Sequence, residues 1–262
     1  MLSRPFLDKP CAKTGFVAGT LIWTDKGLVP IEQIRVGDRV LSKPETNDGP
    51  QAYQRVLKTF HFDDQEVEFV EVARGHRGMG PGFGCTAIVV TGDHPVWAKK
   101  GSESEWRWQP VLPVGSTSQV ELQDGGVCDV IVNEAVLLCE TPEGARIEGI
   151  GYVPVASDSG ASIDFRSGTP VCQLSDSGTT TSGDYSRDRY LTRVYNFTVE
   201  DSHTYYVGEW GFWVHNANGL ELGATIKNAR GSIPAICFGG WRLRRRSATI
   251  GHSGPPIAKR GG

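Results

Sequence analysis

The sequence lacks the features that mark membrane-spanning, secreted, zinc-binding and disulfide-stabilised proteins. It contains no run of 18 apolar residues, so we expect no membrane span. Residues 1–13 are too polar to form the apolar core of a signal peptide. No two of the six cysteines lie close enough to form a CxxC pair, which leaves neither a zinc spacing nor a readable disulfide framework. We therefore expect no metal and no cofactor.

Helical periodicity is almost absent before residue 217, whereas short segments of β-branched and aromatic residues are frequent. The chain also holds 33 Gly and 15 Pro, which favours many turns over long helices. These patterns predict an all-β fold with a twisted or barrel-like body. We expect a tight hairpin turn at Asp25-Lys26-Gly27 and strands at 16–24, 39–42, 53–62, 66–73 (paired with 53–62 as a hairpin), 85–90, 106–122, 128–139, 191–199 and 204–214.

Two segments differ in composition from the rest of the chain. Residues 157–188 are rich in Ser, Gly, Thr and Asp, which indicates a mobile insert or linker within a wider insertion at about 140–190. Residues 1–216 hold 19 Lys and Arg against 29 Asp and Glu, whereas residues 217–262 hold 8 against one Glu. A change of charge this sharp after Asn216 predicts two pieces with different roles.

Five motifs follow one another in a specific order. They are Phe16-Val17-Ala18-Gly19-Thr20, then the segment 27–41, then Thr91-Gly92-Asp93-His94, then the segment 194–207, and last Val214-His215-Asn216. In order and spacing they resemble the Hint (hedgehog/intein) family, and most closely the pretoxin Hint domains of bacterial polymorphic toxins. The resemblance covers roughly residues 15–216 and implies a fold of twisted β-hairpins related by a pseudo-two-fold axis.

The resemblance gives the C-terminal motif a chemical role. The side-chain amide of Asn216 would attack its own backbone carbonyl, close a succinimide ring and cut the chain between Asn216 and Ala217. Fixing the amide against that carbonyl supplies a large proximity effect. His215 would donate to the carbonyl oxygen, and His203 would move the proton between the amide and the leaving nitrogen, a task that suits a near-neutral imidazole.

The Thr91-x-x-His94 motif belongs, in the family, to the other scissile bond, which precedes the first residue of the domain. By this resemblance, His94 would donate to the amide nitrogen of that bond, and Thr91 would bond the neighbouring backbone. In this chain the bond is Thr14–Gly15.

The chain departs from the family at both ends of the domain. Gly15 stands where the family has Cys or Ser, so the N-terminal acyl shift has no nucleophile. Cys11 lies four residues upstream and would reach the bond only if the loop reorganised. Ala217 has no hydroxyl or thiol to receive an upstream segment. We therefore expect a single self-cleavage after Asn216 without splicing, or, as the alternative, a degenerate non-catalytic Hint module that acts as a linker in a larger toxin or surface protein.

The expected organisation is a leader (1–14), the Hint-like domain (15–216) and a basic segment (217–262) that is a released or truncated toxin remnant, disordered or weakly structured. The stretch Trp241-Arg242-Leu243-Arg244-Arg245-Arg246 suits nucleic acid or an anionic surface. The substrate is the chain itself. The resemblance also implies a larger N-terminal toxin carrier and a bacterial, exported or cell-surface toxin system.

Two other interpretations of the motifs are open. The Gly-rich segment 74–84 lacks the Gly-Lys-Ser/Thr ending of a phosphate-binding loop and does not open a helix, so we interpret it as a surface hairpin loop. A metal site could combine His94 and His203 with cysteines, although no pair among them has the spacing of metal ligands.

Overall fold

The computed structural model describes residues 13–74, 84–101, 105–112, 114–115, 117–141, 144–155, 159–168, 170–174 and 185–216. All of them lie in the first of two compact units, Met1–Ala224. Cys11 and most of the leader, the Gly-rich residues 75–83, Ala217 and the basic segment up to residue 262 lie outside the described residues. No helix in the described part is long and apolar enough to cross a membrane.

The described part of the chain is all-β, as the sequence predicts, apart from a short 3₁₀ helix. β-branched and aromatic residues dominate its central strands and suit a pleated, half-buried surface. In chain order the elements are β1 (Phe16–Val17), β2 (Leu21–Thr24), β3 (Gly27–Pro30), η1 (Ile31–Gln33), β4 (Arg39–Ser42), β5 (Ala52–Glu66), β6 (Glu68–Arg74), β7 (Gly84–Val90), β8 (Pro95–Lys100), β9 (Arg107–Pro110), β10 (Ser118–Glu121), β11 (Val127–Ala135), β12 (Leu137–Glu140), β13 (Arg146–Val155), β14 (Ser159–Asp164), β15 (Val171–Leu174), β16 (Tyr185–Arg189), β17 (Leu191–Val199), β18 (Thr204–Val207) and β19 (Phe212–His215).

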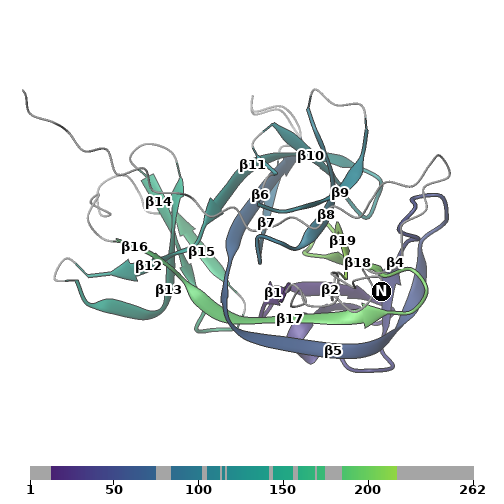
Figure 1. Cartoon of the computed structure of the whole chain (residues 1–262), viewed down its shortest axis with the longest axis horizontal. Helices are drawn as coiled ribbons and strands as arrows, with labels where there is room; N and C mark the ends of the chain where they lie inside the picture. Colours follow the sequence, from purple (N-terminus) through teal and green to yellow (C-terminus); the bar gives the residue numbers. More distant parts are fainter. Residues whose placement is uncertain are drawn as a thin grey trace, which may run out of the picture. The chain divides into compact units, whose positions relative to one another are not determined.

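The larger of the two sheets closes on itself. Its strands follow the order β10-β11-β6-β7-β1-β17-β5-β4-β2-β18-β19-β8-β9, with β3 added to β2, and β10 also pairs with β8. Figure 1 shows β5 and β17 as long curved strands that run side by side, and they pair antiparallel from Leu191↔Glu66 to Val199↔Val56. Closure leaves few open edges, which is how barrel-like sheets avoid edge-to-edge pairing. The predicted barrel-like body is thus confirmed.

The predicted strand at 16–24 is broken in the middle. Gly19 adopts φ +81°, a left-handed conformation that glycine tolerates well. Thr20 Oγ1 closes the turn by donating to Val17 O at 2.8 Å. As a result β1 pairs with β7 and β17, whereas β2 pairs with β3, β4 and β18. The predicted turn at Asp25-Lys26-Gly27 is confirmed, since it joins β2 to β3 with Gly27 at φ +101°.

The predicted hairpin between 53–62 and 66–73 is wrong in its pairing. Both segments are strands, but β5 pairs with β4 and β17, and β6 pairs with β7 and β11. A single residue, the fully buried Val67, separates β5 from β6, and one residue is too short for a hairpin loop. Val67 instead turns a corner, which sends the two strands to different parts of the sheet.

The segment at about 140–190 is an inserted sheet and not a linker in its described parts. Strands β12 to β16 form a second, five-stranded antiparallel sheet in the order β15-β14-β13-β12-β16. Val153 and Ile163 of this sheet share a buried apolar cluster with Val17 and Phe69 of the larger sheet. Of these buried residues, Ile163 lies within the polar segment 157–188, and the composition of that segment does not reveal its burial.

Candidate active site

The Thr14–Gly15 junction is held by Thr91 through two hydrogen bonds. Gly15 N donates to Thr91 Oγ1 at 3.1 Å, and Thr91 N donates to Gly15 O at 3.0 Å. The pairing of Phe16 with Val90 places the end of β7 beside the start of β1 and so brings these groups together. The contact of Thr91 with the neighbouring backbone is the one that the Hint resemblance implies.

A residue that the sequence analysis did not select, Asn196, holds the carbonyl of Thr14. Asn196 Nδ2 donates to Thr14 O at 3.1 Å, and its Oδ1 accepts from Tyr205 Oη and Phe197 N, each at 2.8 Å. The amide is thereby fixed in one orientation. Burial raises the pKa of Tyr205 well above its usual value, so the phenol stays a donor. An N–H donor on Thr14 O is placed to stabilise negative charge on that oxygen.

Gly15 offers no reactive side chain at the position of the family's nucleophile, and the neighbouring backbone leaves no space for one. A Cβ built on Gly15 would lie 2.5 Å from Tyr195 O and 3.0 Å from Tyr195 C. The obstacle is backbone in the paired strand β17, which cannot swing aside as a side chain can. Gly15 therefore lets β1 approach β17 more closely than a cysteine would.

His94 lies in the core and does not make the contact that the resemblance implies. It is fully buried, its ring centroid is 4.4 Å from that of Phe16, and neither ring nitrogen has a hydrogen-bond partner. Burial, and to a lesser extent the charge of His215, lowers the pKa of His94 to about 3, so the ring is neutral. Gly15 N donates to Thr91 instead. The expected donation from His94 to this amide is therefore absent, because an apolar pocket holds the imidazole.

Asn216 is held at the end of β19 against the turn that carries His203. Its backbone N donates to His203 O at 2.9 Å. In the orientation that satisfies both ends of its amide, Nδ2 donates to His203 O at 2.9 Å and Oδ1 accepts from Val199 N at 3.0 Å. Asn216 is 6% exposed. His203 adopts φ +53°, an uncommon conformation for a residue with a side chain, and this turns its carbonyl toward Asn216.

His215 forms a side-chain hydrogen bond with a carboxylate that the sequence motifs do not identify. His215 Nε2 lies 2.8 Å from Glu45 Oε2. The hydrogen bond from His215 lowers the pKa of Glu45 below its usual value, against the raising effect of burial. Glu45 belongs to the turn after β4, and no sequence motif marks it. A polar residue in a turn carries no signal of a partner so far away in the chain.

The two groups of candidate residues are neighbours in the same part of the larger sheet. Val214 pairs with Val96, two residues after His94, and Tyr205 pairs with Val214. Tyr205 in turn lies 6.5 Å from His94, between ring centroids. The structure thus brings Thr91 to the Thr14–Gly15 junction, with His94 in the core nearby, and brings His203, His215 and Asn216 together at the end of β19.

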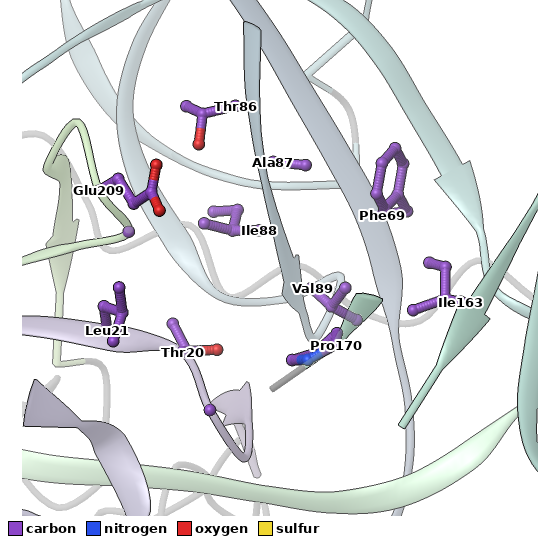
Figure 2. Close-up of a pocket in the computed structure, with 12 residues that line it drawn as sticks. Thr20, Leu21, Phe69, Thr86, Ala87, Ile88, Val89, Ile163, Pro170 and Glu209 are labelled. Carbon is purple, nitrogen blue, oxygen red and sulfur yellow. The ribbon is translucent and has the colours of Figure 1, made fainter. Parts of the chain in front are cut away.

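A pocket of about 230 Å³ lies elsewhere on the same unit (Figure 2). Its walls come from the turn before β2, from β7 and from the inserted sheet, with Glu209 at one side, and none of the candidate site residues lines it. Within the described ranges no group of three His, Cys, Asp or Glu side chains is arranged to hold a metal ion. Cys85 and Cys128 are free thiols.

Comparison with known structures gives intein-type relatives at low sequence identity. A bacterial intein-like domain from Clostridium thermocellum is 23% identical, with a TM-score of 0.46, over 77% of this chain and 98% of that one. The gp41-1 intein is 12% identical, with a TM-score of 0.40, over 78% and 98% of the two chains. A DnaB intein from Synechocystis sp. PCC 6803 is 10% identical, with a TM-score of 0.38, over 78% and 98%. No curated protein matches the chain.

The chain also matches a known protein family over part of its length. Residues 14–112 match the family model described as the Hint domain. The matched segment contains Gly15, Thr91 and His94 and ends before His203 and Asn216. The match covers less than half of the chain, so it shows that residues 14–112 are similar to the Hint domain.

Proposed function

We propose that this chain cleaves its own backbone after Asn216 by asparagine cyclisation and releases residues 217–262 without splicing. The similarity of residues 14–112 to the Hint domain supports an autoprocessing domain in general. The observation that carries the specific proposal is the Asn216 amide, which is buried and held at both ends, by His203 O and Val199 N, directly after His215. A held amide has little rotational freedom left to lose when it attacks its own carbonyl.

The roles follow from the positions of the groups. Nδ2 of Asn216 attacks the carbonyl carbon of the same residue, and the bond to the Ala217 nitrogen breaks. His215 donates to the carbonyl oxygen while negative charge develops on it. His203 moves the proton from the amide to the leaving nitrogen. The reaction consumes its own site, so each molecule turns over once.

We propose cleavage without splicing because each end of the domain lacks a group that splicing requires. Gly15 carries no nucleophile, and the paired strand leaves no room for one. Ala217 has no side-chain nucleophile to receive an upstream segment. Thr91, Asn196 and the Thr14 carbonyl form an assembled junction in which an acyl shift has no attacking atom.

The test is a time course of intact mass on the purified full-length chain. We expect the wild type to lose the mass of residues 217–262, whereas Asn216→Ala stays intact. Asn218→Ala serves as the matched control, since it replaces an asparagine two residues beyond the cut and leaves cleavage unchanged. An intact mass that is the same for wild type and Asn216→Ala after days of incubation would refute the proposal.

A second function, a degenerate Hint module that only spaces other domains, is favoured by two observations. Gly15 has lost the first nucleophile, and His94 is a neutral imidazole without a hydrogen bond in the core. A module of this kind keeps the fold and releases nothing, so the same time course separates the two functions.

The biological setting follows the resemblance to pretoxin Hint domains. In this proposal the chain's own backbone is the substrate, a larger N-terminal toxin carrier precedes the domain, and the system is exported from bacteria. The basic charge of residues 217–262 supports a released segment that binds nucleic acid or an anionic surface. Retention of this segment on immobilised DNA and its release by salt would test the binding.

A further inference from the structure

A carboxylate that no sequence motif selects lies against His215. Glu45 Oε2 is 2.8 Å from His215 Nε2, although the two residues are 170 positions apart. Their side chains are 31% and 14% exposed, so water screens the pair only in part. Because a carboxylate can only accept hydrogen bonds, Nε2 is the nitrogen that carries the proton in this pair.

The turn that carries Glu45 is anchored to the strand opposite His215. Thr204 Oγ1 donates to Lys43 O, and Lys43 N donates to Thr204 Oγ1 at 3.3 Å. Thr204 is the register partner of His215 in the β18–β19 pairing. Trp108 holds the same turn, since its Nε1 donates to Glu45 O at 3.0 Å and its ring centroid lies 5.3 Å from that of His215. The backbone of this turn is therefore held beside His215 from two sides.

We propose that Glu45 is a positioning residue for His215 in the cleavage after Asn216, an inference that rests on the proposed function. In this step Asn216 Nδ2 bonds to its own carbonyl carbon, the bond from that carbon to the Ala217 nitrogen breaks, and the proton lost by the amide ends on that nitrogen. With Nε2–H held by Glu45, the cationic ring of His215 carries its second proton on Nδ1 and presents that N–H to the carbonyl oxygen. Among the described residues Nδ1 of His215 makes no hydrogen bond.

The charge of Glu45 supports the same role. Its pKa is lowered, first by the hydrogen bond from His215 and then by the nearby charges of His215 and His203, so the carboxylate is ionised at neutral pH. An ionised partner at Nε2 stabilises positive charge on the ring, as the orienting carboxylate does in acid–base triads. Two other titratable groups lie near this pair. One is His94, whose pKa is lowered by burial and, to a lesser extent, by the charge of His215. The other is Lys43, which pairs with Glu121 at 3.2 Å.

The experiment compares cleavage rates by intact mass in the full-length chain. We expect Glu45→Ala to slow cleavage by about 10-fold or more, a part of the 10²–10⁴-fold that acid–base groups contribute. Glu45→Gln, which keeps an oxygen acceptor without the charge, should fall between Glu45→Ala and the wild type. Glu121→Ala is the matched control, because it removes a half-buried carboxylate paired with Lys43, and its rate should stay within about twofold of the wild type.

A spectroscopic measurement separates this inference from the proposed function. In the uncleavable Asn216→Ala chain, the ring ¹⁵N shifts of His215 should show the neutral ring protonated at Nε2. In Asn216→Ala with Glu45→Ala they should show a mixture of tautomers. Cleavage by the wild type with an unchanged rate in Glu45→Ala overturns the positioning role, and so do identical His215 shifts in the two uncleavable chains. A wild type that never cleaves overturns the proposed function, and the shifts then report on the pairing alone.

Discussion

Gly15 is one of the two positions, with Ala217, at which this chain lacks a group that splicing requires. The missing side chain removes the nucleophile, and the space that a Cβ needs is occupied by the backbone of Tyr195. The surrounding contacts remain assembled, since Thr91 and Asn196 still hold the two sides of the Thr14–Gly15 bond. The junction is thus ordered without being reactive.

Substitution of Gly15 should cost stability even for the smallest side chain. We predict that Gly15→Ala lowers the free energy of unfolding by about 1–3 kcal/mol, because β1 must move away from β17 to admit the methyl group. Urea denaturation measures the change. Gly115→Ala is the control, since a Cβ there meets nothing within 4 Å. Equal stability of Gly15→Ala and wild type would mean that the junction has more room than the structure shows.

His94 should make the stability of the domain depend on pH. Its pKa of about 3 in the folded chain lies below the ordinary value of 6.5, so between these values the unfolded chain binds one proton more than the folded chain. This contribution to stability is complete above about pH 6.5 and is lost as the pH falls, by about 1.4 kcal/mol per pH unit. The slope should be smaller in His94→Phe when unfolding is measured between about pH 5 and pH 7. Parallel slopes in the two proteins would show that folding does not lower the pKa of His94.

The sequence predicts some of these residues and not others for a physical reason. Thr91 and Asn216 stand in motifs with fixed local spacing, so their neighbours along the chain identify them. Glu45 and Asn196 act through partners that are distant in sequence, across the β4–β5 turn and the β1–β17 pairing. Nothing local distinguishes them from an ordinary turn acid or strand amide. The neutral state of His94 likewise depends on burial that only the folded chain shows.

At the scale of the elements, the positions of the strands were easier to predict than the pairing of one strand with another. Residues 191–199 and 85–90 are strands almost to the residue, because β-branched runs have few other conformations. The break at Gly19 and the corner at Val67 were missed, and each one changes which strands pair. Gly19 stands in an apolar segment and Val67 stands among acidic and polar residues, so the neighbouring residues mark neither position as a break.

The inserted sheet should contribute to the stability of the larger one. Ile163 of β14 is 1% exposed and belongs to the cluster that also contains Val17 and Phe69. We predict that Ile163→Ala lowers the free energy of unfolding by about 2–5 kcal/mol, the range for a deleted core aliphatic side chain. Leu191→Ala, at a leucine that is 51% exposed, should change it by about 0.5 kcal/mol or less. A small effect of Ile163→Ala in urea denaturation would mean that the insert folds without support from the larger sheet.

At the scale of the whole molecule, the two assemblies around residues 15 and 216 belong to one sheet and differ in what they retain. The first keeps its hydrogen bonds and lacks an attacking atom. The second keeps the attacking amide, the adjacent histidine and a carboxylate partner. This asymmetry, together with the reversal of charge after Asn216, supports a domain that severs one bond and joins none.

The most direct test of this account is the mass of the fragment that ends at residue 216. Cyclisation leaves a succinimide at that end, so the fragment is lighter by one water molecule than the product of simple hydrolysis at the same bond. We predict this lighter mass at early times for the wild type and its absence for Asn216→Ala. A fragment that carries a free asparagine acid from the first time point, or a chain that stays whole, would contradict the account.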